Sequence, residues 1–392
     1  MQYAYNNGAR RPGPAEQINP PPPKNNGINI ENIDYAISVS AAVLVLFGII
    51  MVFSSSYYVA GIGEGDPLYY FKKQALFAVM GFCAMYLMSN MNYQFIKKAA
   101  PFVYLMANVL LVVVQFFPSN SSARAMRWIN IPGLNISFQP SEFAKIGVIL
   151  MLSAVIGSKK DLLNRWGGVF KMSALVLVPC ALVAISDFGT AIVLALIGFG
   201  IIFIAAPHTI RYLFLGALGG GAAAAYVIFG GGFRSNRFYA WLDPFAYRST
   251  YGNQIVNSLF AVGSGGFLGL GLGQSRLKIG FLPEAHNDMI FSIVCEELGF
   301  IGAFLILALF CILIARGIKT AMNALDSFGS LVASGIVLMF GCQAIINVAV
   351  VTNSIPNTGI TLPFISYGGS SLVISMFMIG VLLNISRLSR GR

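Results

Sequence analysis

Four of the chain's 14 acidic residues lie close together in the segment FLPEAHNDMIFSIVCEELGF, with one of its two histidines. Carboxyl groups at such positions can accept or donate protons in catalysis. The segment also borders a strongly apolar run, where an ionised carboxylate is costly, so we expect a chemical or structural role for these groups. The residues are Glu284, His286, Asp288, Glu296 and Glu297.

The composition indicates an integral membrane protein. Hydrophobic residues make up 57% of the chain and charged residues 10%, whereas a soluble globular protein carries about 25% charged residues. Long apolar runs, rather than short segments of alternating hydrophobicity, favour helices over a β-barrel. The five cysteines lie in apolar segments without a close pair, which favours small core residues over disulfides or metal ligands.

The apolar runs predict an all-α polytopic membrane protein with about ten transmembrane helices. Residues 1–34 are polar and rich in proline, asparagine and glycine, without the apolar stretch of a signal peptide, so we expect a disordered cytoplasmic tail. The membrane domain is expected over 35–387 and a second cytoplasmic tail over 388–392. The predicted spans are 35–54, 71–90, 99–117, 138–157, 169–185, 188–206, 211–229, 287–315, 328–352 and 364–386.

Basic residues orient these spans, because cytoplasmic loops collect lysine and arginine. With the N-terminus in the cytoplasm, an even number of spans places the C-terminus there too. The largest extracellular loop, 230–286, then lies between the seventh and eighth spans. Basic residues on the outer side either bind an anionic ligand or lie in loops too long for the rule to apply. They are Lys72, Lys73, Arg124, Arg127, Arg234, Arg237, Arg248, Arg276 and Lys278.

Charged residues also lie inside or between the predicted spans. Glu142 and Lys145 are three residues apart at the start of the fourth span, so they share a helical face and can pair. An ionisable pair within a membrane indicates either a functional site or a structural link between helices. Asp187, in the short turn ISDFGT, is expected to cap the sixth span.

Two glycine-rich segments can bring the backbone close to a ligand. GSGGFLGLGLGQS lacks the lysine of a P-loop and the strand of a dinucleotide-binding fingerprint, so phosphate contact and plain tight packing both remain open. The uncharged segment 353–372 is expected to re-enter the bundle and line a cavity. It offers hydroxyl and backbone groups to a polar ligand through Ser366, Tyr367, Gly368, Gly369 and Ser370.

Five motifs in order carry a resemblance to a known family: RWINIPGLNISFQPSEFAKI, DFGTA, GSGGFLGLGLGQS, LPEAHNDMIFSIVCEELGFIG and LPFISYGGSSL. From about residue 35 to 387 the chain resembles the FtsW/RodA/SpoVE family, known as SEDS. The resemblance implies a ten-span peptidoglycan glycosyltransferase that polymerises lipid II, the undecaprenyl-diphosphate-linked disaccharide pentapeptide. It also implies that the reaction takes place at the outer face of the bacterial cytoplasmic membrane. A class B penicillin-binding protein is the implied transpeptidase partner.

The GLGQS motif leans towards the division and sporulation branches of the family. It implies a location at the division septum, with other division proteins and membrane lipid as partners and no nucleic acid. A lipid II flippase and a non-catalytic division scaffold are the alternative functions.

The family's essential acidic residue maps onto Asp288, which the resemblance implies is the general base of an inverting transfer. The family's loop tryptophan maps onto Trp128, and its fourth-span pair onto Glu142 and Lys145. Asn287 replaces a hydroxyl residue common in the family and puts an amide beside Asp288. Candidates to bind substrate are Arg124, Arg127, Arg234, Arg237, Arg276 and Lys278, with Glu284 and His286 around Asp288.

No cofactor is required by the sequence, but a divalent cation, Mg²⁺ or Mn²⁺, that bridges Asp288 and a diphosphate suits the oxygen ligands of such ions. Glu296 and Glu297 lie deeper in the eighth span. We expect them to be structural and to pair with Lys145 or another cation.

Overall fold

The structure is a computed structural model that describes residues 33–116, 127–131, 136–206, 216, 221 and 233–390. The expected N-terminal tail up to residue 32 and the last residues of the C-terminal tail lie outside these ranges. So do Arg124 and nearly all of the expected seventh span at 211–229.

Eight helices in the described ranges are long and apolar enough to cross a membrane. They confirm an all-α, multi-pass membrane protein. A further helix of similar length, α2 (Tyr69–Asn90), carries Lys72 and Lys73 near its start. The eight are α1 (Tyr35–Gly63), α3 (Tyr93–Phe116), α4 (Pro140–Ser158), α5 (Trp166–Ser186), α6 (Phe188–Ala205), α10 (Ile290–Met322), α11 (Ser327–Val351) and α12 (Gly369–Arg390).

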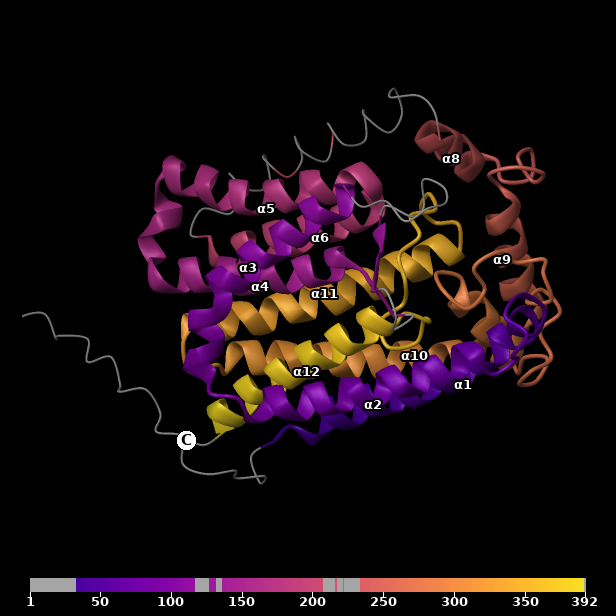
Figure 1. The fold of residues 1–392 in the computed structure, drawn as a ribbon, viewed down its shortest axis with the longest axis horizontal. Helices are drawn as coiled ribbons and strands as arrows, with labels where there is room; N and C mark the ends of the chain where they lie inside the picture. The colour runs from indigo at the N-terminus through magenta and orange to yellow at the C-terminus, as the bar shows by residue number, and fades with distance from the viewer. Residues whose placement is uncertain are drawn as a thin grey trace, which may run out of the picture.

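These helices lie side by side in one bundle (Figure 1). α11 runs through its middle and packs against α4, α6, α10 and α12, while α12 lies against α2 and α1 against α10. Small residues allow helices and buried loops to approach closely. At Gly48 of α1, a Cβ atom would lie only 2.4 Å from the carbonyl oxygen of Phe364.

Polar contacts gather several helix ends at one end of the bundle. Arg316 near the end of α10 pairs with Asp34, the N-cap of α1, at 2.6 Å. The Tyr93 hydroxyl of α3 donates to Asp326, the N-cap of α11. Asn384 of α12 donates to the backbone at the end of α2. The beginning of α1 and the end of α12 therefore share this end, as an even number of spans requires.

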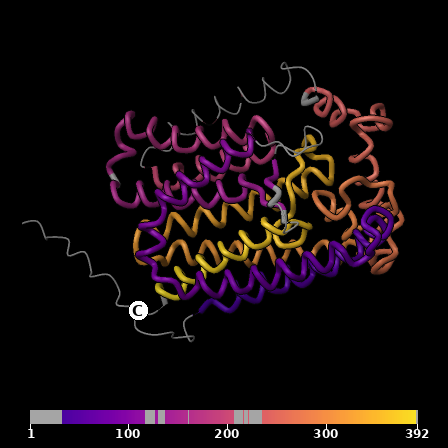
Figure 2. The backbone as a smooth tube through the Cα atoms, in the orientation of Figure 1, coloured from indigo at the N-terminus to yellow at the C-terminus, as the bar shows by residue number. Residues whose placement is uncertain are grey.

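The opposite end carries the shorter elements (Figure 2). Strands β1 (Ile129–Ile131) and β2 (Ile136–Phe138) form a small antiparallel hairpin just before α4. The segment expected as one long loop, 230–286, contains α8 (Phe233–Leu242) and α9 (Asn253–Ser264). The one short helix between α4 and α5, η3 (Lys160–Asn164), lies at the other end of α4.

The eighth span differs from the single helix expected over 287–315. Helix α10 begins at Ile290, and Gly299 interrupts it with a φ of 63° and a ψ of −161°. The glycine-rich segment supplies hydrogen bonds across the break. Leu270 N–H donates to the Glu296 carbonyl and Gly271 N–H to the Glu297 carbonyl, each at 2.9 Å. Because these two backbone N–H groups donate hydrogen bonds within the protein, the tight-packing interpretation of the glycine-rich segment is favoured over phosphate contact.

The tenth span is shifted from the expected 364–386, because α12 begins at Gly369 and ends at Arg390. The preceding residues form an irregular segment whose side chains are buried from Leu362 to Ser366. The Phe364 ring lies 4.9 Å from the ring of Phe340. The segment is thus surrounded by protein, as irregular backbone in an apolar bundle must be.

The break in α10 generates a stability prediction. Gly299→Ala should lower the free energy of unfolding by at least about 2 kcal/mol, because this backbone conformation is essentially confined to glycine. The new Cβ would also lie 2.3 Å from the backbone nitrogen of Gly269. Thermal unfolding of the purified protein in detergent measures the effect.

Gly263→Ala is the matched control, because a Cβ at this α9 position meets nothing within 4 Å. It should leave the unfolding temperature unchanged or raise it. Equal unfolding temperatures for the two variants would contradict the assigned break.

Candidate functional site

Asp288 lies two residues before α10, in a series of turns rather than inside the span. Glu284 takes a left-handed conformation with φ of 57°, and its carbonyl accepts from the N–H of Asn287 at 3.0 Å. Asn347 of α11 fixes the backbone beyond it, since its Nδ2 donates to the carbonyls of Asp288 and Ile360, each at 2.7 Å. One buried amide therefore holds the Asp288 segment against the loop before α12.

The Asp288 carboxylate is partly exposed and lies among amides. Gln254 of α9 donates from Nε2 to Asp288 Oδ1 at 3.3 Å. Gln254 is itself oriented by Asn357, whose Nδ2 donates to Gln254 Oε1 at 2.7 Å. A Cβ at Gly359 would lie 3.6 Å from Asp288 Oδ2, so glycine leaves that oxygen uncovered on this side.

Desolvation raises the pKa of Asp288 from 3.8 to about 7, and the nearby charge of Glu284 acts in the same direction. Arg237 of α8 and the Gln254 hydrogen bond oppose this effect only in part. Arg237 also donates to the Asn357 carbonyl at 3.3 Å. A carboxyl group with a pKa near neutrality is well matched to proton transfer.

His286 lies on an aromatic cluster beside the turn that carries Asp288. Its ring centroid is 4.6 Å from that of Tyr70 and 5.7 Å from that of Tyr367. Its backbone carbonyl accepts from the Tyr367 N–H at 2.9 Å. Burial lowers the pKa of the His286 imidazole, with Glu284 acting in the opposite direction, and burial raises the pKa of the Tyr367 phenol. The rings of this cluster therefore form an uncharged surface beside the turn that carries Asp288.

The SYGGSS motif reaches the same region, although internal hydrogen bonds engage much of it. The Ser366 hydroxyl accepts from the Leu362 N–H at 2.8 Å. Gln74, buried in α2, accepts from the Gly368 N–H and donates to the Ser366 carbonyl. The Ser370 hydroxyl accepts from the backbone N–H of Gln139 at 3.3 Å. At Gly369 a Cβ would collide with the Phe77 ring. These residues shape the loop, and their binding of a ligand stays a prediction.

Glu142 and Lys145 form the expected pair, with Lys145 Nζ 2.7 Å from Glu142 Oε1 and both side chains buried. Ser371 of α12 donates to Glu142 Oε2 at 3.3 Å. The pair lines a cavity of about 30 Å³ that also reaches Gly359. Gly359 thus lies between the buried ion pair and Asp288, and the structure brings these residues together.

The other basic residues predicted to bind substrate differ in exposure and in their ion-pair and hydrogen-bond partners. Arg127 pairs with Asp187 at 3.2 Å and donates to the Ser186 carbonyl. Asp187 also accepts from the Thr190 N–H, which confirms it as the cap of α6. Trp128 follows Arg127 and is half-buried, while the Arg276 side chain is exposed. The Arg234 side chain lies outside the described residues.

Lys278 belongs to a separate buried network at the break in α10. Its ammonium lies 2.6 Å from Glu297 Oε1, and Ser54 of α1 donates to the same carboxylate. Ser275 donates to Glu296 Oε2 at 2.5 Å. The structural role expected for both glutamates is confirmed, with Lys278 as the cation in place of Lys145. This pairing gives the predicted binding of a diphosphate by Lys278 no structural support.

Metal binding at Asp288 stays a prediction. Across the residues that the structure describes, no group of three or more His, Cys, Asp and Glu side chains could hold a metal ion. A cation at Asp288 would thus need most of its oxygen ligands from the substrate, as Mg²⁺ often does at phosphate sites.

Three residues with amide side chains around Asp288 were not identified from the sequence. Asn357 lies in the uncharged segment singled out as cavity-lining, so its position could have been inferred. Gln254 and Asn347 gave no such signal, since amides in helices more often face solvent or neighbouring helices. Only the packing of α9 and α11 around the turn brings them to Asp288.

The fold and the site define a multi-pass membrane protein with a partly buried carboxylate at one end of its helix bundle. A family model described as "Cell cycle protein", which covers FtsW, RodA and SpoVE, matches residues 35–391. The chain belongs to this FtsW/RodA/SpoVE family.

Individual relatives cover almost the whole chain. It is 38% identical to the "Probable peptidoglycan glycosyltransferase FtsW" of Geobacter sp. (strain M18), over 92% of this chain and 99% of the relative. It is 39% identical to the "Stage V sporulation protein E" of Bacillus subtilis (strain 168), over 91% of this chain and 98% of the relative.

Solved structures share the fold. The crystal structure of the Thermus thermophilus rod shape determining protein RodA matches with a TM-score of 0.68 and 24% identity, over 91% of this chain and 97% of that chain. A chain from a structure described as "Structural coordination of polymerization and crosslinking by a peptidoglycan synthase complex" matches with a TM-score of 0.75 and 24% identity, over 91% and 98%.

The pKa of Asp288 predicts a pH-dependent stability. A carboxyl whose folded pKa is raised stabilises the folded state below its unfolded pKa, and that contribution is lost as pH rises through about 7. Asp288→Asn mimics the neutral acid. It should match the wild-type unfolding temperature at about pH 4 or below, exceed it by a growing margin up to about pH 7, and a constant difference would contradict the assignment. Gln254→Leu should shift the transition to higher pH.

The buried network predicts a second stability difference. Lys278→Met leaves Glu297 buried without its cation, so it should destabilise the protein by roughly 3–5 kcal/mol. Adding Glu297→Leu should restore much of the loss. Lys72→Met is the control, because Lys72 and Asp66 form an exposed pair. If the double variant unfolds as early as Lys278→Met, the two charges are not coupled as described.

Proposed function

We propose that this chain is a peptidoglycan glycosyltransferase that polymerises lipid II, with Asp288 as the general base. The observation that carries the proposal is the partly exposed Asp288 carboxyl, with a pKa near 7, held between α9 and α11. Relatives at 36–38% identity over most of the chain are named peptidoglycan glycosyltransferases, which supports the reaction class.

In this proposal Asp288 accepts the proton from the C4 hydroxyl of the acceptor N-acetylglucosamine. The freed oxygen attacks C1 of the donor sugar from the face opposite the diphosphate. A new bond forms between that oxygen and C1, and the bond from C1 to the phosphate oxygen breaks. The electron pair leaves with the lipid diphosphate, so no covalent enzyme intermediate is needed.

The geometry around Asp288 suits this division of roles. Gln254 holds Oδ1, while Oδ2 faces Gly359, where no side chain blocks the approach of a hydroxyl group. Arg237 is the cation whose charge reaches Asp288. We assign it to the diphosphate leaving group, since positive charge there replaces a general acid. Arg276, exposed in the adjoining loop, is the second cation in this role.

Glu142 and Lys145 fit a supporting role on the inner side of Gly359. Their cavity, about 30 Å³, has room for a water molecule but not for a sugar headgroup. This cavity therefore gives headgroup flipping no support, and polymerisation is the function that we favour. We further propose that the chain acts in septal or related wall synthesis, beside a class B penicillin-binding protein.

The test is polymerisation of purified lipid II by the chain together with its transpeptidase partner, with the partner's active-site serine blocked. Asp288→Asn should lower the rate by about 100-fold or more, because loss of a general base typically costs about 10²–10⁴ in rate. The wild-type rate should rise with pH and level off above about pH 7, as Asp288 ionises. A cooperative thermal transition of the variant at pH 7, at or above the wild-type unfolding temperature, shows that the variant is folded.

Polymerisation by Asp288→Asn at the wild-type rate would refute the base assignment. A wild-type complex that flips lipid II in vesicles yet forms no polymer in detergent would refute the transferase function itself.

A further inference from the structure

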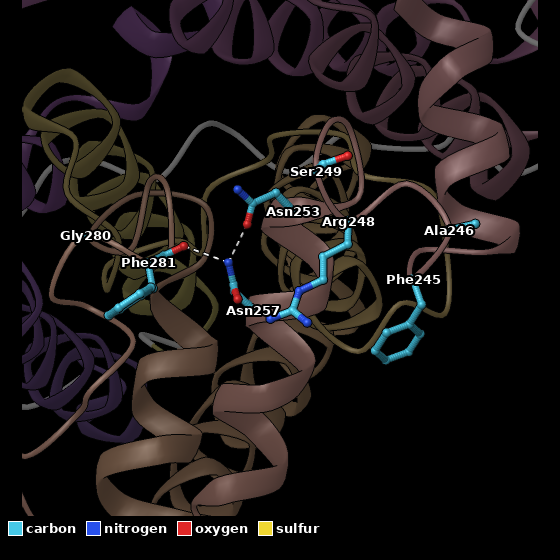
Figure 3. A pocket seen from close by; sticks show the side chains of 8 residues that line it. All are labelled: Phe245, Ala246, Arg248, Ser249, Asn253, Asn257, Gly280 and Phe281. Carbon is cyan, nitrogen blue, oxygen red and sulfur yellow. Dashed lines mark hydrogen bonds between the residues drawn. The ribbon is translucent and has the colours of Figure 1, made fainter.

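A second cavity, of about 520 Å³, lies beside the first turn of α9 (Figure 3). It shares no lining residue with the cavity at Gly359. We call it the α9 pocket. Its volume falls in the range of about 300–1,000 Å³ typical of ligand sites. Its lining includes Phe245, Arg248, Ser249, Asn253, Asn257 and Phe281.

Two amides one helical turn apart form the floor of this pocket. Asn257 donates from Nδ2 to the Phe281 carbonyl at 2.7 Å and to Asn253 Oδ1 at 2.5 Å. These bonds fix both amide planes. Among the described residues, no hydrogen bond engages Asn253 Nδ2 or Asn257 Oδ1. The floor therefore presents an oriented donor and an oriented acceptor, the pair that an N-acetyl group requires.

Arg248 supplies charge at the same place. Its guanidinium carbon lies 5.5 Å from the centroid of the Phe260 ring, and within the described ranges it forms no ion pair. Figure 3 places its head beside Asn257. A guanidinium without an acidic partner can bind a carboxylate through two parallel hydrogen bonds.

Apolar surface borders these polar groups. The Phe281 and Phe245 side chains are 63% and 58% exposed. Large apolar side chains at a polar, concave surface indicate a ligand with an apolar face of its own. The C–H face of a pyranose ring has this character.

The α9 pocket is linked to the reaction site through the same helix and loop. Gln254, which contacts Asp288, is adjacent in sequence to Asn253 and donates also to the Pro283 carbonyl. Residues 281–288 thus run along α9 from the pocket at Phe281 to the carboxylate at Asp288. A linear polymer bound in the α9 pocket can therefore extend to the Asp288 carboxylate.

We propose that the α9 pocket binds the lipid-free part of the glycan strand, made of N-acetylated sugars that carry carboxylate-bearing stem peptides. The sugar amides pair with Asn253 and Asn257, a peptide carboxylate binds Arg248, and a ring lies on Phe281. This assignment deepens the proposed function and rests on it for the identity of the strand.

Binding can be measured without any turnover. The probe is a lipid-free tetrasaccharide of alternating N-acetylglucosamine and N-acetylmuramic acid with stem peptides, titrated into the purified full-length complex and followed by saturation-transfer NMR. Arg248→Ala should weaken binding at least about tenfold, because a charge-assisted pair is lost. Arg248→Lys should fall between wild type and Arg248→Ala.

Two controls separate the pocket from general charge effects. Lys72→Ala removes an exposed cation at the same end of the bundle and should leave the affinity unchanged. A tetramer of N-acetylglucosamine, which has no carboxylate, should bind more weakly than the peptide-bearing probe and should not respond to Arg248→Ala. In the polymerisation assay Arg248→Ala should give shorter strands.

Failure of this inference is distinct from failure of the proposed function. If the wild type does not bind the tetrasaccharide, or if Arg248→Ala binds it as tightly, the α9 pocket is not a strand site, whatever the effect of Asp288→Asn. If the tetrasaccharide binds through Arg248 while no polymer forms from lipid II, the strand site stands and the transferase proposal fails.

Discussion

Backbone that leaves the helical conformation inside an apolar bundle must still find hydrogen-bond partners, and here side-chain amides provide them. Asn347 serves two segments at once, Gln74 holds the SYGGSS loop, and Asn384 covers the end of α2. At the break in α10 the partners are backbone groups of the glycine-rich segment. The position of Asp288 depends on these contacts, because neither the turn before α10 nor the loop before α12 has regular structure.

The basic residues of the fourth span and of the segments expected on the outer side differ in their partners. Lys145 and Lys278 are buried with glutamates, and Arg127 is tied to Asp187. Their charges balance acidic groups that the apolar surroundings would otherwise disfavour. Arg248 and Arg276 are exposed, and the charge of Arg237 reaches Asp288. The positive side chains that pair with buried acidic groups thus stabilise the bundle, whereas we assign Arg237, Arg248 and Arg276 to ligands.

Sequence patterns predicted the helices well, because long apolar runs have few other solutions. They also predicted the Glu142–Lys145 pair and the Asp187 cap, which depend on residues three apart in one helix. The break at Gly299 was missed, since its cause is a segment about 30 residues earlier in the chain. The partner of Glu297 and the amides around Asp288 were missed for the same reason. Contacts between distant segments leave no periodicity in either one.

The interruption at Gly299 also bears on how the chain fits a bilayer. An unbroken helix of 33 residues would be about 50 Å long at about 1.5 Å per residue, far more than a hydrocarbon core of about 30 Å. The part after the break, residues 300–322, is about 35 Å long on the same scale and suffices to cross. The part of α10 before the break therefore does not need to match the thickness of the hydrocarbon core. It carries the carboxylates of Glu296 and Glu297 into contact with neighbouring protein, and Asp288 lies two residues before its first turn.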